Sequence, residues 1–96
     1  MIRSFGDSGT EDLFYRRDTK QARKVCPQEA WSAARRKLEY LNGAKSIADL
    51  IALPAEFKRL KGPLAGWCSL RVNDRYRVVF RWKDEAAEEV QVTDYH

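Results

Sequence analysis

Three side chains that can move or orient protons stand side by side in residues 94–96. Asp94, Tyr95 and His96 supply a carboxylate, a phenol and an imidazole, and His96 is the only histidine of the sequence. An imidazole with its ordinary pKa of about 6.5 can give or take a proton near neutral pH. Because a histidine in the last position is more often a frayed end than a catalyst, its meaning depends on the residues around it.

A block of positive charge precedes these three residues. Between residues 57 and 83 there is a single acid, Asp74, among eight basic residues: Lys58, Arg59, Lys61, Arg71, Arg75, Arg77, Arg81 and Lys83. Residues 84–96 hold five acids and no lysine or arginine. Aromatic residues such as Trp67 are interleaved with the basic ones, a pattern typical of a surface that binds a nucleic-acid backbone. With a phenol and an imidazole beside it, this block indicates a site that cleaves RNA.

Composition limits the class of protein. The sequence has 96 residues, of which 44% are hydrophobic and 33% are charged, which predicts one folded domain over residues 1–96. No apolar run approaches the roughly 20 residues of a membrane span, and no signal-peptide stretch opens the chain, so we expect a cytoplasmic protein without a membrane partner. Cys26 and Cys68, with one histidine, have no metal-ligand spacing. We therefore predict no metal, no cofactor and a reduced, buried thiol at Cys68.

The first half of the chain predicts helices. Residues 1–5 are typical of a short strand, and the polar residues that follow can cap a helix over residues 10–17. Residues 18–26 are polar and predict a loop or a frayed helix. Pro27 can open a second helix, in which apolar residues recur every three or four positions until Asn42-Gly43 ends it. A short turn from Ser46 to Pro54 completes this half.

After Pro54 the period of the hydrophobic pattern changes from about 3.6 to 2. This predicts strands over residues 57–61, 66–73, 75–82 and 88–95, with a tight turn at Asn73-Asp74 in which both residues tolerate positive φ. Helices followed by strands favour an α+β fold. We expect two to three N-terminal helices packed on one face of a small, mostly antiparallel sheet, with the other face open.

Alternation along the strands sorts the basic residues onto the open face of this sheet. If the apolar residues of each strand point to the helices, the opposite side receives Trp67, Ser69, Arg71, Arg75, Arg77, Arg81, Gln91, Thr93 and Tyr95. Arg59 and Lys61 join them if Leu60 points inward. Asp94 and His96 fall on the helix side, so His96 can reach the open face only if the chain bends at Tyr95. A merely soluble face is the alternative, but such a face usually carries acids opposite bases.

Several segments together resemble a known family. They are Met1-Ile2-Arg3-Ser4-Phe5, Gly9, Leu13-Phe14, Arg35-Arg36-Lys37-Leu38, Leu60-Lys61-Gly62, Gly66, Ser69-Leu70-Arg71-Val72, Tyr76-Arg77-Val78, Phe80 and Asp94-Tyr95-His96. This pattern is similar to that of the HigB-type toxins of bacterial toxin–antitoxin systems, also called plasmid maintenance killer proteins, in the RelE/ParE superfamily. The resemblance extends over essentially the whole chain.

The resemblance implies a RelE-like fold, cleavage of mRNA in the ribosomal A site and a HigA-like antitoxin of helix-turn-helix type. It places the functional lysine of the family on Lys61 and the arginine of its sheet on Arg77. The terminal acid, phenol and imidazole fall on Asp94, Tyr95 and His96. Two departures are Lys58, where some relatives carry a histidine, and Pro63, where an acid often follows Leu-Lys-Gly. If that histidine transfers protons in the relatives, the residues that transfer protons differ in this chain.

The reaction that fits these residues needs no metal. The 2′-hydroxyl of the RNA attacks the adjacent phosphodiester, which leaves a 2′,3′-cyclic phosphate and a 5′-hydroxyl. A base, an acid and cations around the developing negative charge are required. Arg77 suits the last role through its planar fork, with Lys61 in support. His96 can be the base or the acid, Tyr95 can stack on a base or ribose, and Asp94 can orient the imidazole. The RNA-binding residues expected around them are Lys58, Arg59, Trp67, Arg71, Arg75 and Arg81.

Two other classes of function remain open at this point. Members of the ParE branch poison DNA gyrase by protein contact and do not cleave RNA. A nucleic-acid-binding module without catalysis is the third alternative. The Leu60-Lys61-Gly62 and Asp94-Tyr95-His96 segments favour the nuclease branch.

Overall fold

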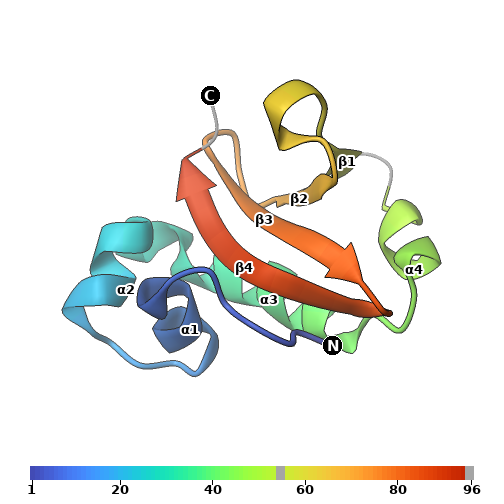
Figure 1. The fold of residues 1–96 in the computed structure, drawn as a ribbon. Coiled ribbons are helices and arrows are strands. Elements are labelled where there is room, and N and C mark those ends of the chain that lie inside the picture. The colour runs from blue at the N-terminus through green and yellow to red at the C-terminus, as the bar shows by residue number, and fades with distance from the viewer. Residues whose placement is uncertain (54–55, 95–96) are drawn as a thin grey trace.

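The sheet is antiparallel and four-stranded, as the computed structural model of the chain shows (Figure 1). The structure describes residues 1–53 and 56–94, and Pro54, Ala55, Tyr95 and His96 lie outside the described residues. The strands are β1 (Phe57–Arg59), β2 (Trp67–Arg71), β3 (Tyr76–Lys83) and β4 (Ala86–Asp94), in the order β1-β2-β3-β4. The predicted α+β class is therefore confirmed, and each strand is close to its expected place.

In the described part of the chain, four α-helices precede the sheet. They are α1 (Ser8–Phe14), α2 (Lys20–Val25), α3 (Trp31–Gly43) and α4 (Ile47–Ile51), with short 3-10 turns η1 (Gln28–Ala30) and η2 (Gly62–Leu64). The stripe predicted for α3 is buried, and the helix ends at Gly43 as expected. None of the described helices is long and apolar enough to cross a bilayer.

Helix α2 shows that the helical alternative predicted for residues 18–26 is the correct one, over Lys20–Val25. The Thr19 hydroxyl accepts a hydrogen bond from the backbone N–H of Ala22 at 3.1 Å and so caps the helix. Within α2 only Ala22 is buried. One alanine gives no periodic apolar signal, so the cap was the sole local sign of this helix.

The positive φ angles occur at a different turn from the one expected. Asp84 and Glu85 have φ of 51° and 62° in the two-residue turn that joins β3 to β4. A two-residue turn in which both φ angles are positive matches the twist of the two strands of a hairpin. At Asn73-Asp74 the φ angles are not positive, and the Asn73 side chain instead accepts the backbone N–H groups of Arg75 and Tyr76.

A β-bulge in β4 changes which residues face the helices. Val79 pairs with Gln91, but Arg81 pairs with Glu88, so β4 has one residue more than β3 in this stretch. Glu89 has a φ of 54° here. The bulge shifts by one residue the alternation of β4 side chains between the two faces of the sheet. As a result Ala87 and Val90 are both buried although they are three positions apart.

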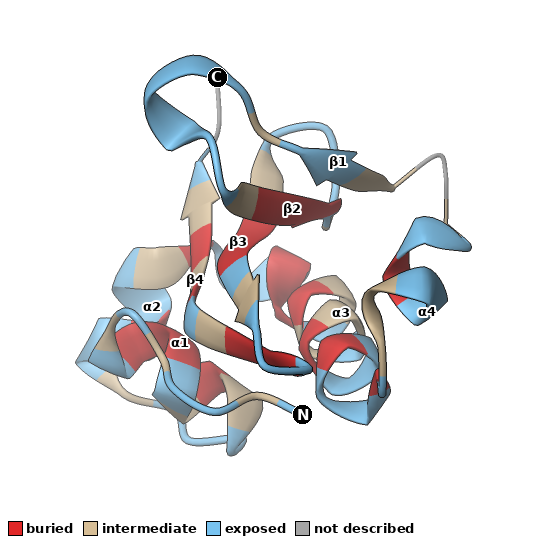
Figure 2. Ribbon diagram, turned by 45° about the vertical axis from the view of Figure 1, so that its right-hand side comes forward, coloured by how far each residue is buried: buried red, intermediate tan, exposed pale blue. Residues whose placement is uncertain are grey.

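Residues 1–5 run parallel to β4 but form no strand of their own. The contacts are isolated bridges from Ile2 to Ala87 and from Phe5 to Val90. They cover the β4 edge of the sheet and leave β1 as the other edge. The helices pack on one side of the sheet, and the buried residues of α3, β2, β3 and β4 form the core between them (Figure 2).

Candidate functional site

Strand register defines the face of the sheet that lies away from the helices, called the open face below. Residues paired across antiparallel strands share a face. The pairs Lys58–Ser69, Ser69–Val79 and Arg71–Arg77 therefore belong together, and Trp67–Arg81, Arg77–Thr93 and Val79–Gln91 extend the same face. Leu70 and Val78, by contrast, lie in the core on the helix side. The predicted sorting of β2 and β3 is confirmed for Trp67, Ser69, Arg71, Arg77 and Arg81, whereas Arg75 precedes β3 and bonds to Asp94.

The middle of the open face is more closely packed than expected. Ser69 is fully buried and Val79 is 8% exposed, although the alternation along the strand predicted a solvated position for Ser69. The Arg77 side chain explains part of this, since its Nε donates a hydrogen bond to Ser69 Oγ at 2.8 Å. Arg77 itself is half-buried.

The second contact of Arg77 comes from outside the sheet. Its Nη2 donates a hydrogen bond to the backbone carbonyl of Glu56 at 2.8 Å. The same carbonyl accepts the backbone N–H of Arg71, and the Glu56 carboxylate pairs with Lys37 of α3 at 2.5 Å. Sequence reasoning missed Glu56, because a backbone carbonyl before a strand leaves no trace in residue type. For Ser69 a signal existed, a serine with the same parity as the arginines.

Three of the arginines expected to bind RNA are paired with acids. Arg71 pairs with Asp74, Arg75 with Asp94 at 2.8 Å, and Arg81 with Glu89 at 3.6 Å. Asp94 and Glu89 come from β4, within the acidic stretch that follows the basic block, so the separation of charge along the sequence is not kept in the fold. Arg81 also lies 5.3 Å from the centre of the Trp67 ring. The open face therefore has less unpaired positive charge than the sequence indicated.

In strand β1 the residues on the two faces are exchanged relative to the expectation. Lys58 pairs with Ser69 and so lies on the open face, whereas Arg59 pairs with Cys68 on the helix side. Phe57, not Leu60, sets the inward direction, since it pairs with the buried Leu70. A shift of one residue exchanges the two faces of a strand. Lys61 follows the strand and directly precedes η2, where it is exposed.

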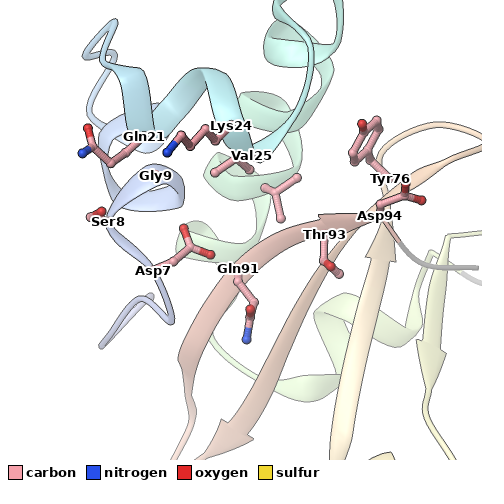
Figure 3. Close-up of a pocket in the computed structure, with 11 residues that line it drawn as sticks. Asp7, Ser8, Gly9, Gln21, Lys24, Val25, Tyr76, Gln91, Thr93 and Asp94 are labelled. Carbon is pink, nitrogen blue, oxygen red and sulfur yellow. The ribbon is translucent and has the colours of Figure 1, made fainter.

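Asp94 lies on the helix side, as its parity predicted. It pairs with Tyr76, and both residues line a surface hollow between α1, α2 and the end of β4 (Figure 3). Its Oδ2 accepts a hydrogen bond from Arg75, and this bond and the charge of Asp94 raise the pKa of Arg75. Arg75 is thus drawn to Asp94 and lies 5.7 Å from the Tyr76 ring. Tyr95 and His96, the phenol and imidazole of the predicted site, lie outside the described residues.

Both cysteines are buried and unpaired, which confirms the prediction of a reduced, buried thiol at Cys68. Burial raises the pKa of the Cys26 thiol to about 11 and raises that of Cys68 as well. Because the thiolate is the reactive form, neither cysteine is suited to nucleophilic chemistry at neutral pH.

Comparison with known proteins assigns the chain to a protein family. Residues 3–96 match the family described as the RelE-like toxin of type II toxin-antitoxin system HigB. The chain belongs to the HigB-like toxins. It is 40% identical to Toxin HigB-1 of Vibrio cholerae serotype O1 over 88 residues. These residues cover 91% of this chain and 90% of that protein. The YoeB-YefM complex from Staphylococcus aureus has the same fold, with a TM-score of 0.57 at 17% identity over 100% of this chain and 98% of the matched one.

In this HigB-like toxin the structure brings some of the predicted site together. Lys58, Ser69 and Arg77 share the open face, with Arg77 bonded to Ser69. Asp94 lies one register position from Arg77 but on the other side of the sheet. A guanidinium in a set orientation with a lysine on the same face can hold a phosphate and stabilise additional negative charge on it.

Proposed function

We propose that this toxin is an endoribonuclease that cuts mRNA in the ribosomal A site without a metal, by attack of the 2′-hydroxyl on the adjacent phosphate. Its membership of the HigB-like toxins over residues 3–96 carries this proposal. The open face adds support, because Arg77 is held there in one orientation and Lys58 lies on the same face. Cations in fixed positions stabilise a phosphorane better than mobile ones, since no reorganisation is needed as charge develops.

Within this reaction each residue has a distinct role. Arg77 stabilises the phosphorane and Lys61 supports it. His96 transfers the proton as acid or base, Tyr95 stacks on the RNA and Asp94 orients the imidazole. Lys58 and Trp67 contact the RNA from the open face, and Arg59 contacts it from the β1 edge. Arg71, Arg75 and Arg81 contact phosphates once these displace their acidic partners.

The partners that we propose are a HigA-like helix-turn-helix antitoxin, the ribosome with its rRNA, and mRNA in the cytoplasm. The family of type II toxin–antitoxin proteins supports an antitoxin. The related solved structure, named as a complex of YoeB with YefM, supports the same conclusion.

The test is incubation of the purified toxin with ribosomes that translate a defined mRNA, followed by mapping of the mRNA ends. We expect cuts at codon spacing with the wild-type protein. His96→Ala should lower the rate by about 10²- to 10⁴-fold, the usual contribution of a general acid or base. Arg36→Ala is the matched control, because Arg36 is exposed on α3, in the helical layer across the sheet, and should leave the rate unchanged.

The other outcomes identify the rival classes. Intact mRNA together with loss of DNA supercoiling would indicate a gyrase poison. Binding to RNA without either effect would indicate a non-catalytic module. Wild-type cleavage rates in His96→Ala would remove the imidazole from the mechanism and direct attention to Lys58 and Lys61.

A further inference from the structure

The guanidinium of Arg77 is held along one edge by two oxygen atoms from different parts of the fold. Its Nε donates to Ser69 Oγ and its Nη2 to the Glu56 carbonyl, both at 2.8 Å. The N–H groups of Nε and Nη2 lie on the same side of the planar group. Two acceptors on one edge therefore set both the plane of the guanidinium and its rotation within that plane.

Ser69 has a position in which packing alone would favour an apolar residue. It lies in the middle of β2, is fully buried, and is flanked by Cys68 and Leu70. A buried hydroxyl lowers stability unless it is hydrogen-bonded, and strands favour β-branched and aromatic residues over serine. The bond from Arg77 satisfies this hydroxyl, so the two residues explain each other's position.

The two oxygens that hold Arg77 differ in kind from the partners of the neighbouring arginines. Arg71, Arg75 and Arg81 are bonded to carboxylates, which offset their charge. The hydroxyl and the carbonyl carry no formal charge and hold the guanidinium through hydrogen bonds. The Glu56 carbonyl is itself anchored, since it also accepts the Arg71 backbone N–H at 3.0 Å and Lys37 holds the Glu56 carboxylate.

We infer that Ser69 is a positioning residue for cleavage, which holds the guanidinium of Arg77 in the orientation that stabilises the phosphorane, with the Glu56 carbonyl as the second anchor. This inference rests on the proposed RNA cleavage. Loss of the hydroxyl frees one end of the guanidinium edge, and a cation that rotates stabilises the transition state less well. Binding of the ground-state RNA depends mainly on charge, which remains.

The experiment compares kcat and KM of Ser69→Ala with those of the wild-type toxin on ribosome-bound mRNA. We expect kcat to fall about 10- to 100-fold, as for loss of one hydrogen bond to a charged group, and KM to change less than about two-fold. Val79→Ala is the matched control. Val79 is the register partner of Ser69 and buried on the same face, so this change removes more packing without removing the hydroxyl, and kcat should stay near wild type.

A double-mutant cycle distinguishes positioning from a separate role. Ser69→Ala combined with Arg77→Ala should be no slower than Arg77→Ala alone, because Ser69 acts only through Arg77. Ser69→Cys keeps the shape of the side chain but replaces the hydroxyl by a slightly larger thiol, which is a weak acceptor, and it should give an intermediate kcat.

Three results would overturn the inference. They are a wild-type kcat in both Ser69→Ala and Ser69→Cys, equal losses in Ser69→Ala and Val79→Ala, and full additivity of Ser69→Ala with Arg77→Ala. A wild-type toxin that leaves ribosome-bound mRNA intact would instead refute the proposed function itself, so the two failures are distinguishable.

Discussion

At the scale of single residues, the arginines of the sheet divide by the partner that each one has. Arg71 and Arg77 stand opposite each other in β2 and β3, an arrangement that like charges disfavour. The repulsion is relieved because the Arg71 guanidinium turns to Asp74 and to the Asn73 carbonyl, while Arg77 turns to Ser69. One arginine thereby closes the β2–β3 turn and the other remains on the open face.

Asp12 gives a prediction at this scale. Its carboxylate accepts a hydrogen bond from the Thr19 hydroxyl at 2.7 Å and pairs with Arg17 at 3.2 Å. The Thr19 bond, helped by Arg17 and opposed by burial, lowers the pKa of Asp12 below its ordinary 3.8. A lowered pKa in the folded state stabilises the fold above the pKa of the unfolded chain, and this contribution is lost as the pH falls through the folded-state value.

We therefore expect Asp12→Asn to be less stable than the wild type at pH 7, with a difference that shrinks between about pH 5 and pH 2. Urea unfolding over a pH series measures it. Asp18→Asn is the control, since Asp18 forms an exposed pair with Arg23 and should change stability little at any pH. A difference for Asp12→Asn that is the same at all pH values would show that its charge is not what stabilises the fold.

At the scale of elements, α1 and α2 meet through their backbones at Gly9. A Cβ added there would lie 2.3 Å from Val25 Cγ2 and 2.5 Å from the Gln21 carbonyl oxygen. Such distances leave no room for a methyl group, so the two helices can approach this closely only over a glycine. Beside it, the buried Thr10 hydroxyl accepts the Val92 backbone N–H at 2.9 Å and ties α1 to β4.

Gly9→Ala should thus push the two helices apart and lower the free energy of unfolding by about 1–3 kcal/mol, the usual effect of overpacking. Thermal or urea unfolding provides the measurement. Gly43→Ala serves as the control, because a Cβ at the end of α3 meets no atom within 4 Å and alanine favours a helix. Equal stability of Gly9→Ala and the wild type would mean that α2 can move away at no cost.

At the scale of the whole molecule, acids from β4 and from the β2–β3 turn meet the basic block of the sheet. Asp94 and Glu89 hold Arg75 and Arg81, and Asp74 holds Arg71. The cations that remain for RNA are fewer than the net charge of the block indicates. A face of this kind can hold phosphates, but it provides little to align a flexible strand for in-line attack. We therefore expect the ribosome to supply that alignment.

This expectation predicts that free mRNA is cleaved far more slowly than the same mRNA on the ribosome, over a series of salt concentrations. If Lys58, Arg59, Lys61 and Arg77 each neutralise one phosphate, and Arg71, Arg75 and Arg81 do so as well after displacing their acidic partners, the log–log dependence of affinity on salt should have a slope of about −5 for a single strand. A slope near about −3 would show that Arg71, Arg75 and Arg81 stay bonded to these acids when RNA binds. Comparable rates on free and ribosome-bound mRNA would contradict the dependence on the ribosome and indicate a general ribonuclease.

The sequence by itself determined what depends on neighbours along the chain. The stripe of α3, its end at Gly43 and the alternation of β2 and β3 follow from residue spacing and local hydrogen bonds. These patterns, with the family resemblance, were enough for the α+β class and for the place of Arg77 on the open face.

Only the tertiary structure decided the contacts between residues distant in the sequence. The β4 bulge, the place of Lys58 rather than Arg59 on the open face, and the pairing of Arg75 with Asp94 all depend on register. Register is set by packing of whole strands on the helices, and a shift of one residue exchanges the faces without altering any local pattern. The bonds from Arg77 to Ser69 and Glu56 arise in the same way, because they join three segments that only the folded sheet brings together.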